Sequence, residues 1–255
     1  MEKKICITFS FVGTAYCGYQ VQKNGVSVQE TLGAAAKELF GFPCDITGCS
    51  RTDSGVHARA FVATIARRGE DVLPTEIPIS HVPRALNAHL PRDIAVKKAK
   101  WVSSAFHARY DAKAKEYEYL FYDGKERDPF FEGRAFAVRP ISAASLAAMR
   151  EAARQFVGTH DFSAFCAASP DKEEKNKTRT VRYAELRRKG DMISFRVAAD
   201  GFLYHMVRIM AGTLFAVAAG KIDPADIAAV LESKDRARAG MTAPAEGLYL
   251  NKVFY

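Results

Sequence analysis

The sequence has few cysteines, no long apolar run and no segment of low complexity. Its five cysteines are odd in number and form no C-x-x-C pair, which excludes a disulfide scaffold and indicates free thiols in a reducing compartment. The longest apolar run, residues 209–220, is well short of the roughly 20 residues that a membrane-spanning helix needs. The first residues alternate between apolar and polar side chains, unlike a signal peptide. We therefore expect a cytoplasmic protein without a membrane segment.

Motifs for metal ions and for nucleotide phosphates are also absent. Cys44, Cys49 and His57 lie near one another in the sequence, but a fourth ligand at zinc-finger spacing is missing. The sequence contains neither G-x-x-x-x-G-K-[ST] nor G-x-G-x-x-G, the two common loops that bind nucleotide phosphates. We expect no bound metal ion.

What remains is a basic, globular chain of 255 residues, long enough for one large domain or two modest ones. Hydrophobic residues make up 48% of it and charged residues 26%, as in ordinary folded proteins and unlike disordered ones. The net charge of +8 suggests a polyanionic partner.

The N-terminal part of the chain predicts a split βαβ unit of the ferredoxin-like kind. Apolar residues alternate over residues 5–11, which is the period of a half-buried strand. Ser27 and Glu30 form a capping box that begins a helix, and Gly41 ends it. A strand-like segment before the polar turn at 48–58, a strand at 61–66 after it, a helix at 80–90 and a strand at 94–101 follow. The order strand, helix, strand, strand, helix, strand predicts an antiparallel sheet.

The rest of the chain repeats this rhythm. Strands are predicted at 113–122, 179–188, 192–198 and 247–254, and helices at 142–157, at 204–219 and from Asp223-Pro224 onward. Lys189-Gly190-Asp191 predicts a hairpin turn, and the polar stretch 169–178 predicts a loop. We therefore expect an α+β protein of two similar ferredoxin-like or RRM-like units, residues 1–102 and 103–255.

The densest polar turn lies at residues 48–58, between two predicted strands. A short loop held by a sheet at both ends positions its side chains well enough for chemistry, which makes Asp53 and Arg51 candidates. The structural alternative is an Asx-turn, in which Asp53 bonds its own backbone, Gly55 has a positive φ and Arg51 is solvated.

Arg208 is the only charged residue in the apolar stretch 201–220. A guanidinium on a buried helix needs a carboxylate and further acceptors, since its desolvation costs several kcal/mol (order of magnitude). In the structural alternative, Arg208 reaches solvent or pairs with a structural glutamate. In the functional alternative, it pairs with an acidic residue at a site, for which Asp53 is the obvious candidate. A carboxylate beside a guanidinium stays ionised, which suits a nucleophile.

A third candidate is the strand near residue 117. Strand periodicity places basic residues and then aromatic residues on one face: Lys113, Lys115, Tyr117, Tyr119 and Phe121. RNA-binding sheets use cations for phosphates and rings for unstacked bases. The alternative is a core face with lysines at its wet end, and the RNP1 pattern of RRM proteins is absent.

Taken together, these segments resemble the tRNA pseudouridine synthase A family over essentially the whole chain. The matching segments are GTAYCGYQ (13–20), SVQE (27–30), SRTDSGVH (50–57), NAHLPRDI (87–94), FHAR (106–109), KEYEY (115–119), DFSAF (161–165), RTV (179–181), HMVR (205–208) and EGLYL (246–250). Four residues depart from the family's usual choices: Ser50 for Gly, Ser54 for Ala, Val12 for Asp and Tyr19 for Trp.

The resemblance implies a pseudouridine synthase fold with the active cleft between the two units. It implies isomerisation of uridine to pseudouridine at positions 38, 39 and 40 of the tRNA anticodon stem-loop, by a homodimer without metal or organic cofactor. Asp53 would be the nucleophile, and Tyr117 would stack on a target base that has been flipped out of the stem. Arg51 and Arg208 would hold Asp53 and the flipped nucleotide. His57 and Leu248 would be further substrate-binding residues.

Two other functions fit the same residues. One is a non-catalytic RNA-binding module that keeps the Asp53 loop for structure. The other is a pseudouridine synthase of the same fold with different target uridines. The sequence leaves open whether Asp53 attacks C6 or the sugar C1′, and whether the Tyr117 hydroxyl is the base that takes the C5 proton.

Overall fold

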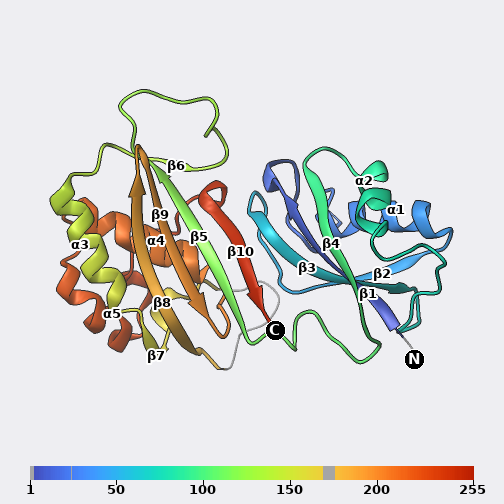
Figure 1. Ribbon diagram of the computed structural model, residues 1–255. Coiled ribbons are helices and arrows are strands. Elements are labelled where there is room, and N and C mark those ends of the chain that lie inside the picture. Colours follow the sequence, from blue (N-terminus) through green and yellow to red (C-terminus); the bar gives the residue numbers. More distant parts are fainter. Residues whose placement is uncertain (1–2, 24, 169–175) are drawn as a thin grey trace. The chain divides into compact units, whose positions relative to one another are not determined.

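The computed structural model describes residues 3–23, 25–168 and 176–255, so most of the loop predicted at 169–178 lies outside the described residues (Figure 1). The chain divides into two compact units. Unit 1 contains residues 1–113 and 249–255, and unit 2 contains residues 114–248. Relative to the predicted boundary between residues 102 and 103, unit 1 reaches further along the chain and also takes in the C-terminal strand.

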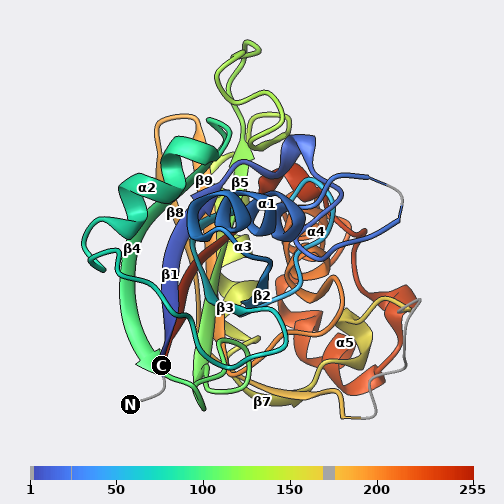
Figure 2. The same cartoon turned by 90° about the vertical axis from the view of Figure 1, so that its right-hand side faces the viewer.

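Unit 1 has the predicted order of elements. They are β1 (Lys3–Phe11), the 3-10 turn η1 (Gly13–Ala15), α1 (Val28–Phe40), β2 (Cys44–Gly48), β3 (His57–Arg67), α2 (Val82–His89) and β4 (Ile94–Ser103). The strands form an antiparallel sheet in the order β4-β1-β3-β2, which confirms the split βαβ arrangement. The two helices lie next to each other beside this sheet (Figure 2).

The last strand of the chain, β10 (Leu248–Phe254), joins the sheet of unit 1 in parallel. Tyr249 lies opposite His57, and Leu250 lies opposite Ala58. This pairing explains why β3 begins at His57, earlier than the predicted strand at 61–66. The turn that precedes β3 is therefore fixed close to the C-terminal strand of the protein.

Local signals set the ends of α1 as predicted. The Ser27 side chain accepts a hydrogen bond from the Glu30 backbone N–H at 3.2 Å, and Gly41 closes the helix in the left-handed conformation with φ 78°. The helix buries one face, as its apolar spacing predicts: Val28, Leu32, Ala35 and Ala36. On the sheet, the ring centroids of Phe9 and Phe61 lie 5.3 Å apart in the core.

Unit 2 contains β5 (Ala114–Tyr122), β6 (Phe136–Ala137), α3 (Ala143–Arg154), β7 (Gly158–Asp161), β8 (Thr178–Lys189), β9 (Met192–Ala199), α4 (Met206–Ala218) and α5 (Ile227–Ser233). It also contains four 3-10 turns: η2 (Ser163–Phe165), η3 (Pro224–Asp226), η4 (Arg236–Arg238) and η5 (Ala245–Gly247). The sheet runs β5-β9-β8-β7 and is antiparallel, and the two-residue β6 lies parallel to β5. Unit 2 repeats the order of elements seen in unit 1: a strand (β5), a helix (α3), two strands (β8 and β9) and a second helix (α4).

The hairpin of β8 and β9 forms where it is predicted. Lys189 pairs with Met192, so Gly190 and Asp191 make a two-residue turn. Gly190 has a φ of 58°, which favours glycine at that position. The long helix begins at Met206, two residues later than predicted, because His205 before it has a φ of 59°.

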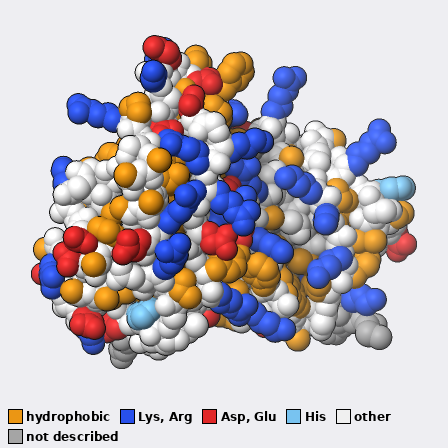
Figure 3. Space-filling model, turned by 60° about the vertical axis from the view of Figure 1, so that its left-hand side comes forward, with side chains coloured by type: hydrophobic (Ala, Val, Ile, Leu, Met, Phe, Trp, Pro, Cys, Tyr) orange, Lys and Arg blue, Asp and Glu red, His pale blue; other side chains and the backbone are white. Residues whose placement is uncertain are grey.

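The protein is thus α+β with mostly antiparallel sheets. None of the helices among the described residues is long and apolar enough to cross a membrane. The five cysteines are free thiols. Figure 3 shows more Lys and Arg than Asp and Glu side chains on the visible face, in keeping with the net charge of +8.

Candidate active site

Asp53 lies in the loop that connects β2 to β3. The Val56 N–H donates a hydrogen bond to the Asp53 carbonyl at 3.2 Å, and Gly55 has a φ of 80°, as the predicted turn requires. At the start of the loop, the Cys49 N–H donates to the Val62 carbonyl at 2.9 Å. The loop is therefore short and held at both ends by the sheet of unit 1.

The segment of residues 13–19 holds the Asp53 loop from one side. The Gly13 N–H donates to Nδ1 of His57 at 2.9 Å, and the Ser54 hydroxyl donates to the Tyr16 carbonyl at 3.2 Å. A Cβ atom on Gly13 would lie only 2.0 Å from the carbonyl oxygen of Val56, so this close approach requires glycine. The loop is thus positioned by contacts within unit 1.

Asp53 is half-buried, whereas Arg51 is exposed to solvent. Within the part of the chain that the structure describes, no carboxylate forms an ion pair with Arg51, and this includes Asp53. Arg51 instead lines a cavity of unit 1. The structure therefore matches the solvated Arg51 of the structural alternative more closely than a guanidinium already bound to Asp53.

His57 lies in the interior of unit 1, with 1% of its surface exposed. Its Nδ1 accepts the hydrogen bond from Gly13, and its ring stacks on Tyr249 with centroids 4.6 Å apart. The Arg59 guanidinium covers Tyr249 at 4.7 Å from the ring centre. These contacts make His57 a support of the Asp53 loop; that it binds substrate stays a prediction.

Tyr117 lies on β5 of unit 2, opposite Val197 of β9, and is 6% exposed. Its ring packs edge-on against Phe202, with centroids 5.1 Å apart. On the same face, the Tyr119 hydroxyl donates to the Pro244 carbonyl at 2.8 Å. Burial raises the pKa of Tyr119, and the nearby positive charge of Arg208 lowers it by a smaller amount. Tyr119 and Phe121 are thus core residues, as the structural alternative for this strand states.

The opposite face of β5 holds two buried carboxylates that the strand pattern did not predict. Glu118 is 4% exposed and accepts a hydrogen bond from Nε of Arg196 at 2.9 Å. Glu116 is 9% exposed and accepts from the Tyr183 hydroxyl. Both interactions lie within the sheet of unit 2, where buried charges require such partners.

Arg208 lies in the first turn of α4 and is half-buried, less buried than the apolar stretch around it predicts. Its Nε donates to the carbonyl of Ala243 at 2.8 Å, and the Ala243 N–H donates to the carbonyl of Arg208 at 3.1 Å. Gly212 permits this approach, because a Cβ atom there would lie 1.9 Å from the carbonyl oxygen of Met241. The Nε of the Arg208 guanidinium is therefore held by a neighbouring segment of unit 2.

Leu248 follows η5, at the start of β10, and is 6% exposed. The predicted site residues thus divide between the units: Asp53, Arg51 and His57 lie in unit 1, and Tyr117, Arg208 and Leu248 lie in unit 2. The approach of Arg208 to Asp53 stays a prediction.

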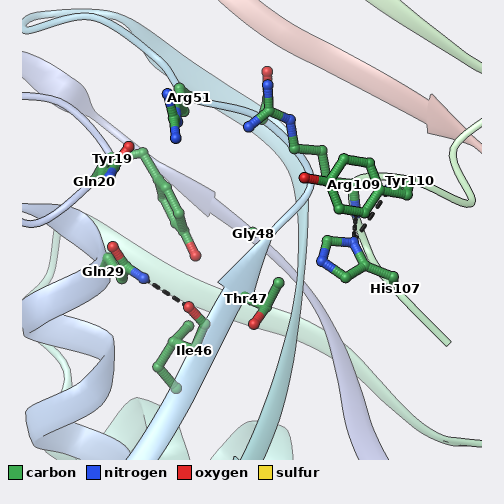
Figure 4. Close-up of a pocket in the computed structure, with 11 residues that line it drawn as sticks. Tyr19, Gln20, Gln29, Ile46, Thr47, Gly48, Arg51, His107, Arg109 and Tyr110 are labelled. Carbon is green, nitrogen blue, oxygen red and sulfur yellow. Dashed lines mark hydrogen bonds between the residues drawn. The ribbon is translucent and has the colours of Figure 1, made fainter. Parts of the chain in front are cut away.

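Unit 1 also contains a cavity that the sequence did not indicate. It has a volume of about 220 Å³, and its lining includes Arg51, His107, Arg109 and Tyr110 (Figure 4). Two of these residues, His107 and Arg109, belong to the FHAR motif at 106–109, and the aromatic residue Tyr110 directly after this motif is the signal that the sequence offers. Of the described residues, no group of three His, Cys, Asp or Glu side chains is arranged to hold a metal ion.

Comparison with known proteins gives a consistent result. A sequence profile described as tRNA pseudouridine synthase matches residues 7–111 and 152–255. The chain is 42% identical over 254 residues to "tRNA pseudouridine synthase A" of Thermoanaerobacter sp. (strain X514), covering 99% of this chain and 100% of that protein. It is 42% identical over 250 residues to the protein of the same name from Bacillus subtilis (strain 168), covering 97% of each.

One similar solved structure is described as a Cbf5-Nop10-Gar1 complex. The match covers 96% of this chain and 48% of that chain, with 14% sequence identity and a TM-score of 0.37.

Proposed function

The chain belongs to the tRNA pseudouridine synthase family and is an isomerase that converts uridine to pseudouridine in tRNA; we propose that its targets are uridines 38, 39 and 40 of the anticodon stem-loop. The observation that carries the proposal is the collinear likeness at 42% identity over nearly the whole of both chains. The matched range includes the Asp53 loop, which presents a carboxylate from a fixed position.

In the proposed reaction, Asp53 is the nucleophile. Its carboxylate bonds to C1′ of the ribose or to C6 of the base, and the N1–C1′ bond breaks. The detached uracil turns, C5 bonds to C1′, and the bond to Asp53 breaks. C5 loses a proton to a base and N1 gains one, so substrate and product are isomers. The half-buried carboxylate suits this role because a substrate atom can reach it.

Tyr117 holds the base while it turns. Stacking on a ring retains uracil without fixing its in-plane orientation, and the edge-on contact with Phe202 keeps the Tyr117 ring in place. Arg208 pairs with the Asp53 carboxylate and helps to hold it against the flipped nucleotide. Its anchoring to Ala243 supports this role, because a fixed cation loses little freedom when it binds.

The target uridine lies in or beside a duplex stem and must be flipped out, at a cost of about a few kcal/mol. The exposed Arg51, which has no ion-pair partner among the described residues, is available to bind the RNA during this step. The net charge of +8 supports binding of the phosphate backbone. The proposal also includes a cytoplasmic homodimer that binds one tRNA with both subunits.

Mapping of pseudouridine in a single unmodified tRNA transcript, before and after incubation with the pure protein, tests the proposal. We expect new pseudouridine at positions 38 to 40 where these are uridines. Tritium release from C5-labelled tRNA without product at those positions would indicate a synthase with other target uridines. Binding of tRNA without any tritium release would indicate a non-catalytic RNA-binding module.

A further inference from the structure

Two arginine side chains from separate segments line the cavity of unit 1 (Figure 4). Arg51 belongs to the Asp53 loop, and Arg109 follows β4. Both are exposed, and neither forms an ion pair with a carboxylate in the described part of the chain. The lining contains no Asp or Glu. Two guanidinium groups that share a cavity without a counter-ion favour the binding of an anion, and their planar shape suits a phosphate.

His107 adds a donor to the same cavity. Its Nδ1 accepts hydrogen bonds from the backbone N–H groups of Arg109 at 3.1 Å and Tyr110 at 3.2 Å. The neutral ring therefore carries its proton on Nε2. Figure 4 shows the ring edge opposite Nδ1 turned toward the side of the cavity formed by Thr47 and Gly48. This arrangement presents an N–H group beside the two guanidinium groups.

Tyr110 gives the cavity an aromatic rim. Its ring rests on His107 with centroids 4.2 Å apart, yet the residue is 76% exposed. The Arg109 guanidinium lies over the same ring, 6.0 Å from its centre. A ring that is supported by a neighbouring side chain and still largely exposed is a platform for an unstacked base. Cations and an exposed ring are thus combined at one cavity, as in sites that bind single-stranded RNA.

The opposite side of the cavity is rigid. The Tyr19 ring is 3% exposed and stacks on Phe61, with centroids 4.4 Å apart. A Cβ atom on Gly48 would lie 2.4 Å from this ring, so only glycine fits there. The Gln29 amide donates to the Ile46 carbonyl at 2.7 Å and fixes the adjoining wall. The volume of about 220 Å³ lies below the usual range for drug-sized ligands, roughly 300–1,000 Å³, which favours part of one nucleotide.

We propose that this cavity is a nucleotide-binding subsite for single-stranded RNA. It binds one backbone phosphate between Arg51 and Arg109, with a hydrogen bond from Nε2 of His107, and the attached base stacks on Tyr110. Arg51 is two positions from Asp53 in the same loop, so the bound nucleotide is a close neighbour of the target uridine. This inference rests on the proposed function for the identity of the RNA.

Salt-dependent binding of a full-length tRNA transcript tests the phosphate contact. Asp53→Asn serves as the parent protein, so that the RNA is not converted during the measurement. We expect Arg109→Ala to weaken tRNA binding. We also expect it to reduce the magnitude of the slope of the logarithm of the association constant against the logarithm of the salt concentration by about one. The matched control is Arg84→Ala, which removes an exposed arginine of α2 and leaves the slope at its parent value. Equal slopes for Arg109→Ala and the parent overturn the proposal.

The double variant Arg51→Ala, Arg109→Ala tests whether one phosphate is shared. If both arginines are required to hold one phosphate, the double variant loses no more slope than Arg109→Ala, about one in total, whereas two separate phosphates predict a loss of about two. The larger loss would overturn the shared contact. Thermal denaturation of each variant verifies that it is folded. Arg109→Lys keeps the positive charge, so its slope equals that of the parent if charge alone makes the phosphate contact.

The base contact is tested at Tyr110. Tyr110→Ala weakens tRNA binding about tenfold, whereas Tyr110→Phe keeps the ring and binds like the parent. Equal affinities of the Ala and Phe variants would refute base stacking. Pseudouridine mapping with the wild-type protein runs in parallel. If the wild-type protein forms pseudouridine normally and Arg109→Ala has the same salt slope as its parent, only the subsite is refuted. If the wild-type protein forms no pseudouridine, the proposed function is refuted.

Discussion

The backbone N–H of Gly13 donates a hydrogen bond to Nδ1 of His57, 2.9 Å away, and so joins the first residue of η1 to the first residue of β3, where the Asp53 loop ends. Both groups are buried, and the His57 ring is held further by its stack on Tyr249. The position of Asp53 therefore depends on contacts between segments that are far apart in the sequence.

Replacement of His57 by alanine is expected to destabilise unit 1. The change leaves the Gly13 N–H without its acceptor and removes the stack on Tyr249, with a cost of about 2–4 kcal/mol in the free energy of unfolding. Arg59→Ala is the control, because it removes an exposed cation over the Tyr249 ring and leaves the Gly13 N–H with its acceptor, at a cost of about 1 kcal/mol or less. Urea denaturation measures both; equal losses would contradict the supporting role of His57.

Gly13→Ala is expected to displace the Asp53 loop. The added Cβ atom meets the Val56 carbonyl oxygen at 2.0 Å, so the chain must move, at a cost of about 1–3 kcal/mol together with a loss of turnover. Gly33→Ala in α1 provides the comparison, since its Cβ meets only Ile46 at 3.9 Å and alanine favours the helix by about 1 kcal/mol. Turnover of Gly13→Ala at the wild-type rate would show that the loop tolerates the shift.

Asp53→Asn is expected to abolish product formation and to leave tRNA affinity nearly unchanged. An amide is a poor nucleophile, while affinity comes mostly from phosphate contacts and the release of counterions. Single-turnover assays with saturating enzyme separate the two effects. Substantial turnover by Asp53→Asn would exclude Asp53 as the nucleophile.

Tyr117→Phe separates the ring of Tyr117 from its hydroxyl. The phenyl ring keeps the edge-on contact with Phe202 and the stack on the base, so we expect tRNA affinity to be retained. Tyr117→Ala removes the ring and is expected to lose turnover. If turnover of Tyr117→Phe equals that of the wild type, the hydroxyl is not the base that takes the C5 proton.

Asp161 is expected to make the stability of unit 2 depend on acid pH. Its carboxylate accepts hydrogen bonds from the Ser163 hydroxyl at 2.6 Å and N–H at 2.9 Å, and Lys234 lies 3.0 Å away. The Ser163 hydroxyl, then Lys234, hold the pKa of Asp161 below its ordinary value of 3.8. A lowered pKa stabilises the fold above the unfolded-state pKa, and the contribution is lost as pH falls through the lower, folded-state value.

Urea denaturation of Asp161→Asn at pH 7 and at pH 3 tests this dependence. The variant is expected to lose stability at pH 7 and to lose less relative to the wild type at pH 3. Asp226→Asn, at an exposed residue of η3, is the control and is expected to show no such difference. A loss for Asp161→Asn that does not change with pH would contradict the role of the ionised carboxylate.

The sequence by itself determined the family and the longer helices and strands of this protein in their order, but not the short strands β6 and β7. The ends of α1 depend on Ser27, Glu30 and Gly41, and the β8–β9 turn depends on Gly190. These residues act on backbone groups within a few positions, so their effect is readable without the fold. The same holds for the turn at Asp53 and Gly55, because the positive φ of Gly55 and the hydrogen bond between Val56 and Asp53 are local.

Only the tertiary structure decided how distant segments meet. The tie between Gly13 and His57, the arrival of β10 beside β3 and the anchoring of Arg208 on Ala243 join residues that no local pattern relates. The cavity of unit 1 likewise brings Arg51 to Arg109 and Tyr110. Such contacts follow from packing and strand pairing across the whole unit, and a sequence pattern with a period of two or 3.6 residues carries no information about them.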